Sequence, residues 1–380
     1  MPRFYDMAET APGKIDTLTS LRFFAAFAIV LYHIPYVLPT LYRGGAFAQM
    51  GIGVDFFFVL SGYVLGITYG ERANWSAADY FRRRFARIYP VYLLTTVMWV
   101  VLLLNYWQIP AQDKFNSGIA HLLLVHAFLS GPLYTLGFNA PAWTISNEAF
   151  FYAVFPFVRR RWAPLVTIAT LALYIFLYRA SFDALNAVYP NFFGYFPLAT
   201  FWKFGLGVAL AQLWTPRTLG YLVGTVLELA AVALMLFAAV HGFPLPGDLG
   251  DIARASVTLF TIAVFACQSG ALSRLFRLPA MVLLGDASYS LYLWHHMLML
   301  YAAQFLPIDP VGRFGRIALT MAIIFPIILL SVATYRWFER PLRRWIAGRP
   351  KDENGARSDV ESAPAFARWP ALEHHRARPN

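Results

Sequence analysis

Apolar residues occur in long runs along most of the chain, and short polar segments separate these runs. Two of the runs, 219–240 and 317–333, approach the roughly twenty residues that an α-helix needs to cross a bilayer. Strands of a membrane barrel would instead alternate between apolar and polar residues over about ten positions. Because backbone polar groups within a bilayer must pair internally, the pattern predicts an all-α, polytopic integral membrane protein.

About ten transmembrane helices are expected, one for each main apolar run. Their predicted bounds are 18–35, 50–69, 88–104, 143–158, 164–179, 198–214, 220–240, 253–268, 283–303 and 317–337. One more apolar segment, 119–133, is only about fifteen residues long, and a glycine and a proline lie near its end. It is therefore left out of the spans as an interfacial or re-entrant segment, although the sequence alone leaves a crossing open.

The distribution of arginine predicts the orientation of these helices. Basic residues collect in the cytoplasmic loops of membrane proteins, and the loop after the second span is rich in them. Its arginines are Arg72, Arg82, Arg83, Arg84 and Arg87. With ten spans, the triplet 159–161 falls on the same side, so both termini are expected in the cytoplasm. The chain becomes polar near its end, which predicts a transmembrane domain over 1–345 and a flexible cytoplasmic tail over 346–380.

Composition agrees with a membrane protein and narrows the set of partners. Apolar residues make up 59% of the 380 residues and charged residues 13%, whereas soluble domains have about a quarter charged residues. The net charge of +11 is explained by the basic loops, so membrane lipids and no nucleic acid are expected as partners. With one cysteine there is no disulfide framework, and neither a metal site nor a bound cofactor is expected.

The first span contains two ionisable residues, Arg22 and His33. A charged side chain at the centre of a membrane helix costs about 2.5–3.5 kcal/mol on insertion scales, so each needs a reason. Eleven residues separate them, which places both on one helix face about 16 Å apart along the axis. Two interpretations stay open for each residue. Arg22 extends to the headgroups and His33 forms an interhelical hydrogen bond, or both line a polar site inside the bundle.

Two carboxylates are expected at a depth similar to that of His33. Asp55 lies near the start of the second span, where it either holds an imidazole in one tautomer or caps the helix. Glu148 shares a stripe with Thr144 and Tyr152 because the three are four residues apart. It is a candidate proton carrier, with a structural hydrogen bond as the alternative.

Polar residues of the second, sixth and ninth spans complete the candidates. In the ninth span Ser288, Tyr292 and His295 can share one face, with aromatic packing as the alternative. Ser61 follows the second span's apolar residues, where a small residue also permits close helix packing. Lys203, in the sixth span, is expected to be a structural partner of one carboxylate.

Several of these stretches resemble motifs of the acyltransferase-3 family of bacterial membrane proteins. The motifs are Arg22-x10-His33, the stretch from Gly53 to Tyr63, Arg84-x-x-Arg87, Trp143-Thr144-Ile145-Ser146-x-Glu148, the stretch from Ser288 to His295, and Glu339-Arg340-Pro341. They occur in the family's order over about 14–345, whereas 164–280 is similar only in hydropathy. Larger members of the family carry an extracytoplasmic hydrolase-like domain, and no outer loop here is long enough for one, which suggests the short form.

The resemblance implies an O-acyltransferase of the bacterial inner membrane. The expected reaction moves an acyl group, commonly acetyl, from cytoplasmic acyl-coenzyme A to a hydroxyl of a cell-surface or exported glycan or glycolipid. It implies His33 as general base, with Asp55 or Glu148 orienting it. The implied donor- or substrate-binding residues are Arg22, Arg84, Arg87, Ser61, Tyr292 and His295. The alternative is a transporter or flippase, which buried charges would also suit but which inverted repeats would favour.

Overall fold

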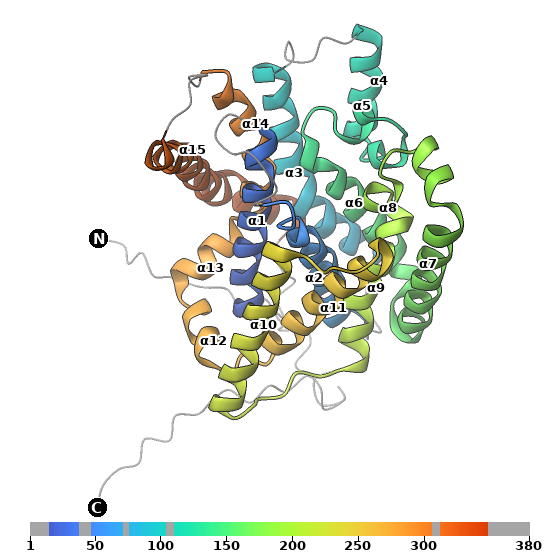
Figure 1. Ribbon diagram of the computed structural model, residues 1–380, viewed down its shortest axis with the longest axis vertical. Helices are drawn as coiled ribbons and strands as arrows, with labels where there is room; N and C mark the ends of the chain where they lie inside the picture. Colours follow the sequence, from blue (N-terminus) through green and yellow to red (C-terminus); the bar gives the residue numbers. More distant parts are fainter. Residues whose placement is uncertain (1–14, 38–46, 71–75, 104–109, 306–311, 349–380) are drawn as a thin grey trace, which may run out of the picture.

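The computed structural model describes residues 15–37, 47–70, 76–103, 110–305 and 312–348. Every regular element within these ranges is helical (Figure 1). The elements are α1 (Asp16–Val37), α2 (Ile52–Tyr69), α3 (Ala77–Leu103), α4 (Ala111–Leu122), η1 (His126–Phe128), α5 (Pro132–Thr135), η2 (Ala140–Ala142), α6 (Trp143–Val158), η3 (Arg160–Trp162), α7 (Ala163–Val188), α8 (Phe192–Tyr195), α9 (Pro197–Leu213), α10 (Tyr221–His241), α11 (Gly247–Ala266), α12 (Ala271–Phe276), α13 (Pro279–Asp286), α14 (Ser288–Ala303), α15 (Arg313–Thr334), η4 (Tyr335–Glu339) and α16 (Arg340–Ala347). The all-α prediction is therefore confirmed, and most of the predicted tail lies outside the described residues.

Each of the ten predicted spans overlaps a helix, and 283–303 overlaps two, the end of α13 and all of α14. Not all of these helices are long. Seven described segments are long and apolar enough to cross a membrane. They are Asp16–Tyr36, Ile52–Tyr69, Ala77–Leu103, Ala163–Val188, Tyr221–His241, Gly247–Ala266 and Phe314–Ala347. The others, α6, α9 and α14, have 16, 17 and 16 residues. The chain is thus a multi-pass membrane protein, while the count of ten and the cytoplasmic termini stay predictions.

The segment left out of the spans is broken into short pieces. Helix α4 ends at Leu122, and η1 and α5 follow as single turns. Leu124 and Gly131 interrupt the chain with φ values of +57° and +106°, a region that is strained for residues other than glycine. No single helix therefore runs through 119–133, in agreement with its omission.

Helix α2 lies at the centre of the bundle and α7 at its edge. In the most apolar 18-residue stretch of each helix, 67% of the α2 residues but only 11% of the α7 residues are buried. Figure 1 shows α7 and α15 at opposite edges of the molecule, with α1 and α2 between them. Helix α1 packs on α2, α13 and α14, and α2 packs on α9. The polar residues of the first two spans are therefore turned into protein and not into lipid.

Glycines allow α2 and α9 to approach closely. A Cβ atom on Gly62 would lie 2.0 Å from the backbone oxygen of Phe204, and one on Gly207 would lie 1.9 Å from that of Val59. No side chain fits at such distances, so the two backbones are in direct contact. Small residues at helix crossings have this role in membranes, and the crossing fixes the position of α2.

Candidate active site

A cavity lies inside the bundle, between α1, α2, α3, α6 and α14. Its volume is about 60 Å³, enough for a few water molecules. The lining residues are Arg22, Val54, Phe57, Phe58, Arg87, Ile88, Thr144, Ile145, Glu148, Tyr289 and Tyr292. The wall is therefore mostly apolar with a few convergent charged and hydroxyl groups, as in many ligand sites. Four predicted site residues, Arg22, Arg87, Glu148 and Tyr292, meet here.

The polar stripe of α6 forms one wall of this cavity. The hydroxyl of Tyr152 donates a hydrogen bond to Glu148, and the hydroxyl of Ser61 donates to the same oxygen over 3.1 Å. One turn earlier, the hydroxyls of Thr144 and Tyr292 are 2.8 Å apart. The structure thus confirms that Thr144, Glu148 and Tyr152 form one polar stripe on α6. Ser61 of α2 contacts the carboxylate of Glu148 directly.

The two arginines of the Arg-x-x-Arg motif point into the protein. Nη1 of Arg87 lies 2.5 Å from Oε1 of Glu339, whose other oxygen accepts a hydrogen bond from Ser290 over 2.9 Å. The Arg87 side chain is 16% exposed and that of Glu339 only 1%. The Arg87 guanidinium also lies 5.4 Å from the ring centroid of Tyr289. Arg87 is therefore already ion-paired, and an anionic ligand would compete with Glu339 for it.

Arg84 lies within a group of three tyrosine rings. Its guanidinium carbon is 5.6, 6.0 and 5.6 Å from the centroids of Tyr69, Tyr80 and Tyr152. Cation–π contacts of this kind attract a guanidinium to the ring faces. Because Tyr152 also donates to Glu148, Arg84 is connected to the cavity wall through that ring.

Three histidines gather beyond Tyr292, on α1 and α14. Nδ1 of His33 lies 2.9 Å from the carbonyl oxygen of Ile29 and 3.2 Å from Nε2 of His295. Nδ1 of His295 lies 2.7 Å from the carbonyl oxygen of Tyr292. The ring of His296 is edge-on to that of His33, with centroids 5.1 Å apart. Tyr292 therefore lies between the cavity, which it lines, and the histidines, which its backbone contacts.

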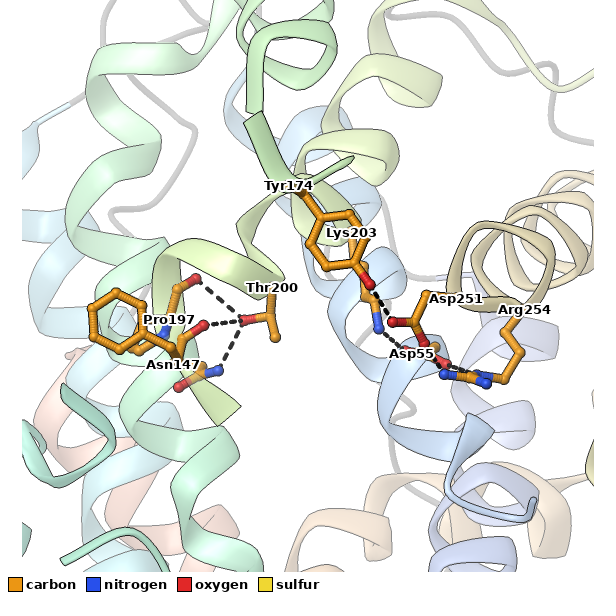
Figure 2. A network of polar contacts seen from close by, with 9 residues as sticks. Asp55, Asn147, Tyr174, Pro197, Thr200, Lys203, Asp251 and Arg254 are labelled. Carbon is orange, nitrogen blue, oxygen red and sulfur yellow. Dashed lines mark hydrogen bonds and ion pairs between the residues drawn. The ribbon is translucent and has the colours of Figure 1, made fainter. Parts of the chain in front are cut away.

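Asp55 belongs to a separate charge network (Figure 2). Its oxygens bind Nζ of Lys203 at 2.6 Å and Nε of Arg254 at 3.2 Å. Arg254 also pairs with Asp251, which accepts a hydrogen bond from Tyr174. The predicted role of Asp55 in orienting His33 is wrong in this structure, because both carboxylate oxygens are bound by cations. Of the alternative, the side-chain cap is absent, since no side-chain hydrogen bond caps the start of α2, whereas Asp55 does lie in the first turn of that helix.

The same network confirms one prediction and shows what another missed. Lys203 is the structural partner of a carboxylate, as expected. Arg254 stands at the very start of the predicted span 253–268 and was not among the candidate site residues. The helix instead begins at Gly247, so Arg254 lies two turns inside it and reaches Asp55. Glu148 does not orient His33 either, because its described hydrogen bonds go to Ser61 and Tyr152.

Three buried carboxylates were not singled out from the sequence as charged partners, namely Glu228, Asp248 and Glu339. Glu339 was noted only as part of a motif, and the structure makes it the partner of Arg87. Glu228 lies within α10 and accepts hydrogen bonds from the backbone nitrogens of Gly270 and Ser273 over 2.8 and 3.1 Å. It caps the start of α12 and is remote from the cavity lining. A single acidic residue within a long apolar run was the available signal for it.

No metal centre is apparent among the described residues: no group of three or more His, Cys, Asp or Glu side chains is arranged to hold an ion, and this includes the three histidines. The site thus consists of a charged cavity and a histidine cluster.

Comparisons with known proteins give a consistent result. The family model of an acyltransferase domain, Acyl_transf_3, matches residues 15–336. The acyltransferase MdmB of Streptomyces mycarofaciens is 28% identical over 322 residues, which cover 76% of this chain and 80% of MdmB. The exopolysaccharide production protein ExoZ of Rhizobium meliloti is 30% identical over 313 residues, covering 79% and 92%. The O-acetyltransferase OatA of Staphylococcus aureus is 25% identical over 386 residues, covering 88% of this chain and 58% of OatA. No solved structure matches the chain.

Proposed function

We propose, from the premise that this chain belongs to the Acyl_transf_3 family of acyltransferases, that it transfers an acetyl group from acetyl-coenzyme A to a hydroxyl of a cell-surface or exported glycan. The observation that carries the proposal is the cavity, where Arg22, Arg87 and Glu148 meet next to Tyr292 and the histidine cluster. ExoZ is named for exopolysaccharide production and OatA for O-acetyl transfer, which supports a glycan acceptor. The bacterial inner membrane is the proposed location.

The donor would bind at the end of the cavity that Arg87 lines. Coenzyme A carries several phosphate charges at one end and a thioester on a long, narrow arm at the other. Phosphate oxygens would compete with Glu339 for the guanidinium of Arg87, and Arg84 lies one helical turn before it. Arg22 would meet the arm inside the cavity. Because the cavity holds only about 60 Å³, donor binding requires the side chains of its wall to move apart.

The chemistry then requires a base for the acceptor hydroxyl. His33 would be this base, with the ring nitrogen that does not face Ile29 or His295 turned to the acceptor. The hydroxyl oxygen attacks the thioester carbon as His33 removes the hydroxyl proton. The carbon–sulfur bond breaks, the ester forms, and the proton passes to the leaving thiolate to give free coenzyme A. Arg22 and His33 lie about 16 Å apart along α1, a separation comparable with an extended pantetheine arm.

The test begins in cells and ends with purified protein. Deletion of the gene should remove O-acetyl signals from the NMR spectrum of the surface polysaccharide, and the wild-type gene should restore them. In nanodiscs, the protein should transfer label from acetyl-labelled acetyl-coenzyme A to alkali-deacetylated polysaccharide of the deletion strain and release coenzyme A. A transporter would release no coenzyme A. If deletion leaves the polysaccharide unchanged and the purified protein does not consume acetyl-coenzyme A, the proposal is refuted.

Two histidine variants, one of His33 and one control, test the role of the base in the same experiment. His33→Ala should lower the rate by about 10²–10⁴-fold, as loss of a general base does, and still accumulate in the membrane. His241→Ala is the matched control, because His241 is exposed at the end of α10 and remote from the cavity lining. An abundant His33→Ala protein with full activity would remove His33 from the mechanism.

A further inference from the structure

Two backbone carbonyls determine which nitrogens of His33 and His295 carry protons. A carbonyl oxygen only accepts hydrogen bonds, so a ring nitrogen beside one must be the donor. Nδ1 of His295 faces the oxygen of Tyr292 at 2.7 Å, and Nδ1 of His33 faces that of Ile29 at 2.9 Å. Each neutral ring therefore carries its proton on Nδ1 and a lone pair on Nε2.

This assignment also gives the contact between the two rings a direction. Nε2 of His295 lies 3.2 Å from Nδ1 of His33, so the lone pair of His295 accepts part of the hydrogen bond that His33 donates. Nε2, the basic nitrogen of His33, has no hydrogen-bond partner among the described residues, while Nδ1 on the other side of the ring is bound.

We propose that His295 is a positioning residue, which, together with the carbonyl oxygen of Ile29, holds the Nδ1–H group of His33 and so directs Nε2 toward the acceptor hydroxyl. The inference rests on the proposed acyl transfer and adds a specific partner for its base. His295 is fully buried and is fixed by a carbonyl of its own helix α14, so its Nε2 has one orientation relative to α1.

The same contact supports the reaction after proton transfer. When His33 has taken the hydroxyl proton on Nε2, its ring is positively charged and Nδ1–H becomes a stronger donor. His295 and the oxygen of Ile29 both accept from that group. The third residue of a Ser-His-Asp triad acts in this way, because it fixes the tautomer and stabilises the imidazolium. Here a neutral imidazole occupies that place, and no carboxylate is needed beside His33.

His296 provides a matched comparison on the same helix. Its ring is edge-on to His33 at 5.1 Å between centroids, close to the 5.0 Å between His33 and His295. However, His296 forms no hydrogen bond with His33, and its Nδ1 is buried without a partner among the described residues. Two neighbouring histidines thus contact the same ring, and only His295 also accepts a hydrogen bond from its Nδ1–H group.

The experiment compares three variants of the full-length protein in nanodiscs, with acetyl-coenzyme A and alkali-deacetylated polysaccharide as substrates. His295→Leu should lower kcat by about 10- to 100-fold, the range seen when a partner that orients a functional histidine is removed. Its KM for acetyl-coenzyme A should stay within about threefold of wild type, since uniform binding is unchanged. His295→Gln should recover much of kcat, because the amide oxygen can accept from Nδ1 of His33 in place of Nε2.

His296→Leu should lower kcat clearly less than His295→Leu does, because it removes a ring contact with His33 and no hydrogen bond to it. Equal losses in His295→Leu and His296→Leu would overturn the inference, because they would reduce both histidines to packing. Full activity in His295→Leu would overturn it as well. Turnover in wild type that depends on His33 separates these results from failure of the proposed function, which would appear as no acetyl transfer by the wild-type protein.

A spectroscopic measurement keeps the inference testable if His295→Leu accumulates poorly. In protein labelled with ¹⁵N-histidine, the His33 signals, assigned by their loss in His33→Ala, should show a protonated Nδ1 and a bare Nε2. His295→Gln should preserve this pattern. A wild-type His33 with its proton on Nε2 would contradict the proposal, whatever the activity of the variants.

Discussion

The ion pair between Asp55 and Lys203 offers a sharp test of what Asp55 does. Their side chains are 7% and 9% exposed, and the charged atoms are 2.6 Å apart. Removing one partner of such a buried pair typically destabilises a protein by about 3–5 kcal/mol, because the other charge stays buried without compensation. Replacing both partners with neutral residues is often close to neutral.

The second cation of the network makes the two single variants unequal. In Lys203→Met, Asp55 keeps Arg254, whose Nε is 3.2 Å from its other oxygen. In Asp55→Asn, Lys203 loses its ion-pair partner, whereas Arg254 retains Asp251. We therefore expect Asp55→Asn to lower the free energy of unfolding by about 3–5 kcal/mol and Lys203→Met to lower it by less. The double variant should be more stable than Asp55→Asn.

The assay is SDS titration of the purified protein in mixed micelles, followed by far-UV circular dichroism. Acetyl transfer by the double variant is then measured at an SDS-free condition where it is folded. If Asp55 is only structural, as its contacts indicate, the folded double variant should retain activity. Two outcomes would refute the reasoning: strictly additive losses in the double variant, or a larger loss for Lys203→Met than for Asp55→Asn.

Further predictions concern packing, capping and the donor. Gly207→Ala should reduce stability and membrane accumulation because its Cβ would lie 1.9 Å from a backbone oxygen of α2, whereas Gly220→Ala, with open space around it, should have little effect in the same SDS titration. Glu228→Leu should destabilise the protein by about 1–3 kcal/mol or more, since it leaves buried donors at the start of α12 unsatisfied, and unchanged stability would contradict this. Arg87→Ala should raise the apparent KM for acetyl-coenzyme A about tenfold or more and exceed the effect of Arg84→Ala, because only Arg87 lines the cavity. Equal KM values for both variants and wild type would show that the donor phosphates bind elsewhere.

The features that could be predicted from the sequence are those that depend on residues close together along the chain. Apolar runs located the helices because the requirement to bury backbone groups in lipid acts on each segment separately. Helical periodicity placed Thr144, Glu148 and Tyr152 on one stripe, and the structure confirms it through the bond between the last two. It also placed Arg22 on a face that points into the bundle, where it lines the cavity.

The contacts between helices could not be predicted in this way. The bonds from Lys203 to Asp55, from Arg87 to Glu339 and from His295 to His33 join residues 148, 252 and 262 positions apart. Periodicity gives the face of a helix but not the helix that it meets. Asp55 was therefore expected beside His33 because the two were judged to be at similar depth, although Asp55 contacts Lys203 and Arg254 whereas His33 contacts His295.

Helix α2 shows how both parts of the site depend on one short stretch. Val54, Phe57 and Phe58 line the cavity, and Ser61, one turn further on, donates to Glu148. These positions follow the i, i+3, i+4, i+7 spacing of a single helix face.

A second face of α2, about a third of a turn round the helix, has an equally regular spacing and meets mainly α9. Asp55 binds Lys203 of α9 as well as Arg254 of α11, the backbone oxygen of Val59 meets Gly207, and Gly62 meets Phe204. The residues that line the cavity and the residues that contact α9 alternate along 54–62 of the same helix. A shift of α2 along α9 would therefore move the cavity-lining side chains of α2 by the same distance. The ion pair and the glycine contacts therefore both hold α2 at the rotation and depth at which Ser61 meets Glu148. We expect the glycine contacts to keep this geometry when both charges are neutralised, so Asp55 supports the site through stability and not by touching the reacting atoms.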